Sequence, residues 1–232
     1  MIDLVNPNII VSLSGFANSG KTHLALTFPD PIAYFDFDIG GVMPVLKKFP
    51  GKRVDLKSYP IPIIDSDPPK PYASEIWHQV DEDYKDACAG GKYKTIVIDT
   101  ATALWEIIRH SVAEEIHQKK LLEVQYTMPN LRMRSLFARA QLSGVNLVTL
   151  QYLSDRYVKG ENTGELGVKG WQETETKSDI ALWCTMKVVR ASGGKNDVYV
   201  ESSVHKDRFL REMNGQILRD ATYDDLLALT GV

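Results

Sequence analysis

The sequence has little cysteine, no surplus of positive charge and no long apolar run. Its two cysteines, Cys88 and Cys184, lack metal-binding spacing and therefore indicate reduced thiols in a cytoplasmic compartment. A net charge of −3 provides no global positive field for nucleic acid, so any DNA contact has to be local. No run reaches the ~18 apolar residues of a membrane span, and the N-terminus lacks the basic region of a secretory signal. We therefore expect a cytoplasmic protein with no membrane contact.

The composition that remains is ordinary for a globular protein. Hydrophobic residues make up 44% of the chain and charged residues 25%, which is compatible with a packed core under a solvated surface. A length of 232 residues suffices for one sizeable α/β domain. We expect residues 1–232 to form a single domain.

Residues 15–22 are the stretch around which the chain is organised. Their sequence fits G-x-x-x-x-G-K-[ST], the pattern of a phosphate-binding P-loop, and a predicted buried strand precedes them while a predicted helix follows. The glycines let backbone N–H groups turn inward around a phosphate, and the helix offers its positive N-terminal end. Lys21 would reach the β- and γ-phosphates, and the Thr22 hydroxyl would bind Mg²⁺. The predicted nucleotide-binding residues are Gly15, Asn18, Ser19, Gly20, Lys21 and Thr22.

Two further predicted strands end in carboxylates. Residues 94–100 form a β-branched run that ends at Asp99 and resembles a Walker B strand, so Asp99 joins Thr22 as a predicted metal ligand. Residues 32–35 predict another strand, and alternation places the following Asp36 and Asp38 on one side. Ligands bind at the carboxyl ends of strands in open α/β sheets, although a solvated acidic loop would give the same pattern.

The third predicted core strand, residues 145–151, ends at Gln151. A polar residue there suits a sensor of the γ-phosphate and equally suits a side chain that faces water. Residues 154–178 follow as a predicted mobile loop, which is too long for a routine connection and is therefore functional or disordered. Within it, Lys169 and Trp171 could hold one phosphate and stack one base, but a mobile surface loop explains them as well.

The C-terminal third predicts an antiparallel hairpin and a short helix. A strand-like run at 179–190, a Gly-Gly turn and a return strand place Lys206 and Arg208 at the hairpin tip. Two solvated charges on an exposed hairpin are the alternative interpretation of this pair. A near capping box predicts a short helix at 222–230.

Apolar spacing and prolines organise the rest of the chain. Helical periodicity predicts an amphipathic helix at 73–88 and further helices after residues 100 and 130. Five prolines predict an irregular surface loop over 60–71, and the sequence Met-Pro-Asn at 128–130 predicts a loop that ends in an N-cap.

In this order the motifs resemble those of the RecA-like ATPases, especially the small phage-type RecA-like proteins of single-strand annealing. The resemblance covers about residues 8–210. It implies an α/β fold with a RecA-like P-loop NTPase core. The expected sheet is twisted and mostly parallel, with helices on both faces and a C-terminal antiparallel hairpin.

The resemblance also implies roles for individual residues. Asp38 stands where the family usually has Glu and would be the catalytic acid, while Gln151 would sense the γ-phosphate. Residues 154–178 would be the DNA-binding loop. Lys206 and Arg208 would reach the ATP site of a neighbouring subunit.

The function that follows from the resemblance is binding and hydrolysis of ATP with Mg²⁺, in action on single-stranded DNA during recombination, annealing or repair. A homo-oligomer with ATP sites between subunits is implied, in a bacterial or phage-infected cell, while filament, ring and monomer all stay open. Two other interpretations compete. One is a nucleotide-gated interaction module without DNA binding, favoured by the net charge and by the acids in 154–178. The other is a ring ATPase that drives a helicase or packaging partner.

Overall fold

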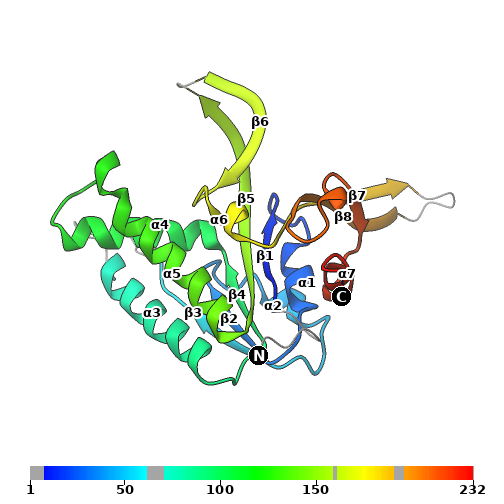
Figure 1. The fold of residues 1–232 in the computed structure, drawn as a ribbon, viewed down its shortest axis with the longest axis horizontal. Coiled ribbons are helices and arrows are strands. Elements are labelled where there is room, and N and C mark those ends of the chain that lie inside the picture. The colour runs from blue at the N-terminus through cyan, green and yellow to red at the C-terminus, as the bar shows by residue number, and fades with distance from the viewer. Residues whose placement is uncertain (1–7, 62–70, 159–160, 191–195, 232) are drawn as a thin grey trace.

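A mixed sheet forms the centre of the molecule (Figure 1). The computed structural model describes residues 8–61, 71–158, 161–190 and 196–231. Within them, nine strands form a sheet in the order β3-β2-β4-β5-β1-β7-β8-β9, and β6 pairs with β5. The strands are β1 (Ile10–Ser14), β2 (Ile32–Asp36), β3 (Val54–Ser58), β4 (Thr95–Asp99), β5 (Asn146–Val158), β6 (Glu161–Lys169), β7 (Ile180–Arg190), β8 (Asn196–Asp207) and β9 (Ile217–Arg219).

Helices cover both faces of this sheet (Figure 1). They are α1 (Lys21–Leu26), α2 (Met43–Leu46), α3 (Ala73–Ala89), α4 (Ala101–Glu115), α5 (Thr127–Ser143), α6 (Thr174–Lys177) and α7 (Tyr223–Ala228), with 3₁₀ turns η1 (Glu123–Tyr126) and η2 (Arg211–Met213). On one face, α3, α4 and α5 bury Ile76, Leu104 and Phe137 in one core cluster. On the other face, α1 and α7 bury Leu24 and Leu226 in a second cluster.

The central strands are parallel, which brings their carboxyl ends to one edge. Strands β3, β2, β4, β5, β1 and β7 pair in parallel, while β8, β9 and β6 run antiparallel to their neighbours. All residues of β1, β2 and β4 are buried, as expected for strands covered on both faces. The predicted α/β fold, with helices on both faces and an antiparallel C-terminal hairpin, is confirmed.

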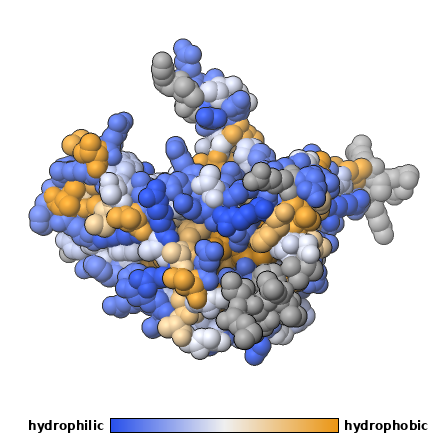
Figure 2. Space-filling model, viewed as in Figure 1, coloured by the Kyte–Doolittle hydropathy of each residue, from blue (hydrophilic) through white to orange (hydrophobic). Residues whose placement is uncertain are grey.

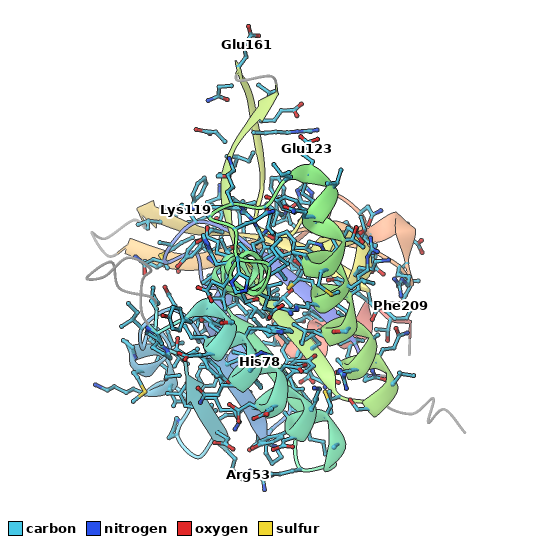
Figure 3. All side chains as sticks on the ribbon, turned by 90° about the vertical axis from the view of Figure 1, so that its left-hand side faces the viewer. Arg53, His78, Lys119, Glu123, Glu161 and Phe209 are labelled. Atoms are coloured by element: carbon cyan, nitrogen blue, oxygen red, sulfur yellow. The ribbon has the colours of Figure 1, made fainter. Side chains whose placement is uncertain are left out.

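A long hairpin rises from the carboxyl edge of the sheet. In Figure 3, Arg53, just before β3, lies at the foot of the molecule, whereas Glu161, at the start of β6, lies at the top. The prediction that residues 154–178 form a mobile loop is therefore wrong. Strand β5 continues past the sheet to Val158 and pairs with β6, and the short helix α6 completes the segment. The hairpin has few hydrophobic side chains along its length (Figure 2), so no apolar alternation marks it as strand.

The position predicted for Lys206 and Arg208 is also wrong. Strand β8 continues to Asp207, and Lys206 pairs with Ala181 near the start of β7. Both cations therefore lie at the base of the β7–β8 hairpin. The two strands pair as far as Arg190 and Asn196, and residues 191–195 between them lie outside the described residues.

Helix boundaries agree with the sequence in most places. Helix α7 has the expected capping box, because the Thr222 N–H and hydroxyl both donate to Asp225. The loop predicted at residues 128–130 is wrong, since α5 begins at Thr127. Pro129 lies in the first turn, where its missing N–H costs nothing, and Asn130 accepts a hydrogen bond from Trp171 at 2.9 Å. Most of the predicted loop at 60–71 lies outside the described residues. Among the described residues, no helix has the length and apolarity to cross a membrane.

Candidate active site

The P-loop turns tightly between β1 and α1, and glycine is required at two of its positions. A Cβ on Gly15 would lie 2.4 Å from the Ser19 hydroxyl and 2.5 Å from the Cys184 carbonyl oxygen. Gly20 has a φ of +89°, and a Cβ there would lie 2.4 Å from a methyl group of Val200. The pattern of two glycines therefore reflects close packing of the loop against β7 and β8, and this packing aims the loop at the carboxyl edge.

Lys21 is buried within the loop that it ends. Its Nζ donates to the carbonyl oxygens of Gly15 at 2.9 Å and Phe16 at 2.8 Å, and to the Ser19 hydroxyl at 3.3 Å. Burial lowers the pKa of Lys21, and neighbouring carboxylates, including that of Asp99, offset part of the decrease. The ammonium group thus occupies the phosphate side of the loop and is held by neutral acceptors.

Asp99 and Thr22 meet beside the loop. The Thr22 hydroxyl donates to the Asp99 carboxylate at 3.3 Å, and the hydroxyl of Tyr34 from β2 donates to the same oxygen. Strand register accounts for this placement, since Asp99 ends β4 at the level of Asp36 on β2. A carboxylate and a hydroxyl are the hard oxygen ligands that Mg²⁺ takes alongside water and nucleotide phosphates. The two predicted metal ligands are therefore brought together.

Asp99 makes the stability of the nucleotide-free protein depend on pH. Burial raises the pKa of its carboxyl from 3.8 to about 6, despite the hydrogen bond from Tyr34. Because this folded-state pKa exceeds the unfolded one, the contribution of Asp99 to stability is complete below pH 3.8 and is lost as pH rises through about 6. Relative to the parent, neutral Asp99→Asn should therefore gain on the order of 1–3 kcal/mol between about pH 4 and pH 7. Urea unfolding without Mg²⁺ measures this gain, and a pH-independent difference would contradict it.

The two acids after β2 have different environments. Asp36 is buried, and its carboxylate accepts the backbone N–H groups of Asp38 and Gly40, both at 2.9 Å. Asp36 therefore holds the turn that carries Asp38. Asp38 is exposed toward the P-loop, and its carboxylate accepts a hydrogen bond from the Tyr152 hydroxyl at 3.3 Å.

One cleft of about 470 Å³ at the carboxyl edge of the sheet brings together the P-loop, Asp38 and Asp99. The P-loop and the start of α1 form its floor, and β8 forms one wall. Asp38 lines it from the turn after β2, and Asp99 and Tyr152 line it from β4 and β5. The remaining lining residues include His23, Val45, Lys48, Met186, Val198, Tyr199, Val200 and Asp220. The cleft thus offers a cation and loop amides for phosphates, an oxygen pair for Mg²⁺ and a solvent-facing carboxylate, which together fit a Mg²⁺–nucleotide.

Comparison with known proteins identifies the family of this chain. The family model AAA_24, described as an AAA domain, matches residues 8–209. The chain belongs to this family. Among solved structures it is similar to a KaiC-like protein, PH0186, from the hyperthermophilic archaeon Pyrococcus horikoshii. The sequence identity is 11% and the TM-score 0.46, over 92% of this chain and 84% of that one. No curated protein matches the sequence.

Within the AAA domain, Gln151 lies away from the cleft. Its side chain is buried on the opposite face of β5, where it accepts a hydrogen bond from Ser12 at 3.1 Å and donates one to Thr174 at 3.0 Å. A phosphate sensor and a water-facing side chain would both lie at the open edge of the sheet, whereas the Gln151 side chain is buried. The side chain that β5 directs into the cleft is the next one, Tyr152.

Trp171 is also unavailable for stacking a base. Only 2% of its surface is exposed, because its ring packs against Phe137 and its indole N–H donates to Asn130. Lys169, at the end of β6, is exposed, and its carbonyl oxygen accepts the Thr102 hydroxyl at 2.7 Å. The predicted pairing of Lys169 with Trp171 around a nucleotide is therefore not formed.

Lys206 and Arg208 contact their own chain. The Lys206 ammonium donates to the carbonyl oxygens of Glu175, Thr176 and Ser178 around the end of α6. Arg208 forms an ion pair with Asp179 at 2.8 Å. These contacts stabilise the junction between α6 and β7 in the AAA domain, and a role at a neighbouring ATP site stays a prediction.

We expect Lys206→Ala to destabilise the AAA domain by about 1–3 kcal/mol, because three backbone carbonyls lose a charged donor. Urea unfolding measures this loss. Lys187→Ala is the matched control on the same hairpin, since Lys187 makes only an exposed ion pair with Glu201 and should cost below about 1 kcal/mol. If Lys206→Ala and Lys187→Ala lower the free energy of unfolding equally, the Lys206 contacts at the end of α6 do not contribute as proposed.

The sequence interpretation missed Tyr34 and Tyr152, which bring phenol groups to Asp99 and Asp38. A signal for Tyr152 was available, because Val148, Leu150 and Tyr152 alternate on one face of β5. Val148 and Leu150 lie in the cluster beneath α1. Tyr34 packs in the same cluster, and the sequence alone predicts no more than an ordinary core residue at this position.

Proposed function

We propose that this AAA domain binds and hydrolyses ATP with Mg²⁺. The observation that carries the proposal is that Lys21, Asp99 and Asp38 line a single cleft at the carboxyl edge of the sheet. Lys21 begins α1, Asp99 ends β4 and Asp38 follows β2, so only the fold brings these residues together. Phosphoryl transfer depends mainly on positioning and charge, so a cleft that supplies both needs little covalent chemistry.

Each group in the cleft has a distinct role. Lys21 and the loop amides hold the phosphates, and Thr22 with Asp99 would hold Mg²⁺, which neutralises charge on the phosphate oxygens when bound. Asp38 is exposed and forms no ion pair with another described residue, so its carboxylate can orient water or accept its proton.

The finer part of the proposal is action on single-stranded DNA through the β5–β6 hairpin. The hairpin rises from the end of β5 (Figure 1), where Tyr152 lines the cleft, and its exposed residues, including Lys169, offer a surface beside the nucleotide. Such a surface would serve recombination, annealing or repair by binding single-stranded DNA in a nucleotide-dependent way.

A nucleotide-gated interaction module is the second candidate, and the charge of the hairpin favours it. Residues 152–169 carry three acids, Asp155, Glu161 and Glu165, against three bases, Arg156, Lys159 and Lys169, so the hairpin has no net positive charge. Arg156 is also engaged by Glu165 at 3.3 Å. A hairpin of this composition suits a protein partner at least as well as a phosphate backbone. The partner could be a helicase or a packaging protein that a ring of this ATPase drives.

The ATPase rate with and without single-stranded DNA, over a series of salt concentrations, separates these candidates. Stimulation by DNA, with an affinity that falls as salt rises, supports action on DNA. Hydrolysis that is indifferent to DNA at every salt concentration would favour the interaction module. Absence of any Mg²⁺-dependent hydrolysis, with or without DNA, would overturn the ATPase proposal.

Assembly through the β7–β8 hairpin is part of the proposal. Met186 and Val198 line the cleft and are 44% and 54% exposed, and Val188, which pairs with Val198 across the strands, continues this apolar surface. An apolar wall beside a nucleotide site suits coverage by a second copy of the chain. If the sites are shared, ATPase activity per subunit should rise steeply with protein concentration, whereas a constant specific activity would contradict the homo-oligomer.

A further inference from the structure

Tyr152 lies at the point where β5 leaves the sheet and becomes the hairpin. Its side chain lines the cleft, and its hydroxyl donates to the Asp38 carboxylate at 3.3 Å. The Lys21 ammonium lies over its ring, 5.0 Å from the centroid. Tyr152 therefore contacts both the residue that would hold the phosphates and the residue that would act on water.

The backbone of Tyr152 is joined to the root of the hairpin. Its N–H donates to the Thr102 hydroxyl at 3.2 Å, and that hydroxyl donates to the Lys169 carbonyl oxygen at 2.7 Å. Tyr152 and Lys169 are also register partners across β5 and β6. Thr102 in turn belongs to the first turn of α4, three residues after Asp99. One hydroxyl thus fastens the two hairpin strands to the helix that follows the metal ligand.

The Tyr152 phenol is a reliable donor near neutral pH. Burial and the adjacent Asp38 carboxylate raise the pKa of Tyr152 to about 12. The hydroxyl hydrogen is therefore present near neutral pH, and it engages one oxygen of the Asp38 carboxylate.

We propose that Tyr152 is a positioning residue that orients Asp38 for hydrolysis and couples occupancy of the cleft to the β5–β6 hairpin. When Lys21 turns from the loop carbonyls toward a phosphate, it leaves the ring face of Tyr152. The ring and its backbone then adjust together, and Thr102 transmits the adjustment to Lys169. This inference rests on the proposed ATPase function.

Tyr152→Phe tests the orienting role, because it removes the hydroxyl and keeps the ring beside Lys21. We expect kcat to fall about tenfold or more while KM for ATP changes less than about threefold, since a hydrogen bond to a charged group is lost and the phosphate contacts stay. Tyr126→Phe is the matched control, because its ring packs on Trp105 away from the cleft. A parental kcat in Tyr152→Phe would overturn the orienting role. Absence of turnover in the parent would overturn the proposed ATPase instead.

Hydrogen–deuterium exchange tests the coupling without catalysis. Adding Mg²⁺ and a non-hydrolysable ATP analogue should change the exchange rate of the amides at 152–158 and 161–169 by about threefold or more in the parent. Thr102→Val keeps the side-chain volume and removes the shared hydroxyl, so the analogue should still bind while this change disappears. An unchanged hairpin in the parent with analogue bound, or an undiminished change in Thr102→Val, would overturn the coupling.

Discussion

Lys21→Ala should weaken the binding of Mg²⁺–ATP by on the order of 10²–10³-fold or more, while the protein stays folded. The cation and its phosphate contacts are lost together, and each charged hydrogen bond contributes about 1.5–3 kcal/mol. In the nucleotide-free protein, Lys21 donates its hydrogen bonds to atoms of the loop from Gly15 to Ser19, and its ammonium also lies over the Tyr152 ring. Its removal therefore leaves both core clusters intact.

Isothermal titration with a non-hydrolysable analogue measures this loss, and a thermal unfolding curve checks the fold. Lys47→Ala is the matched control, because it makes the same truncation at the exposed end of α2, outside the cleft. Parental affinity in Lys21→Ala would show that the loop does not hold the nucleotide. An equal loss in Lys47→Ala would point to a general electrostatic effect.

Asp38→Asn should slow ATP hydrolysis by on the order of 10²–10⁴-fold and leave binding close to normal. Asparagine keeps the volume and one acceptor oxygen for the Tyr152 hydroxyl, but it removes the base. Because Asp38 is exposed, its replacement should cost little stability.

Single-turnover hydrolysis separates the chemical step from binding. Asp86→Asn, an exposed substitution on α3, is the matched control on the opposite face. Parental turnover in Asp38→Asn would contradict its role as the catalytic acid. Asp36 would be a poor substitute, since both of its oxygens accept backbone N–H groups.

Local motifs made much of the site predictable. The P-loop pattern identifies Lys21 and Thr22, because the glycines that turn the backbone amides toward a phosphate fix the positions of the lysine and the threonine that follow. The apolar run before Asp99 identifies a buried parallel strand, whose carboxyl end must lie at the ligand edge. The order of strands across the sheet, which places Asp99 beside Thr22, depends on long-range pairing and could be expected only from the family resemblance.

The errors concern which way a strand faces and where it stops. The polarity of Gln151 suggests a residue at the site, but neighbouring strand residues point to opposite faces, so Tyr152 reaches the cleft and Gln151 does not. The β5–β6 hairpin has the sequence pattern of a loop because both of its faces are exposed, which removes the alternation that reveals strands. The sequence predicts Lys206 at a tip because it does not show that β8 continues to Asp207.

A crystal structure with Mg²⁺ and a non-hydrolysable ATP analogue tests the central claim most directly. The account predicts phosphates on the loop of residues 15–22, with Lys21 turned from the Gly15 and Phe16 carbonyls toward them. Mg²⁺ should lie between the Thr22 hydroxyl and Asp99, with Asp38 facing the γ-phosphate. A nucleotide bound elsewhere, or bound here without Lys21 and Asp99 as ligands of its phosphates and metal, would contradict the account.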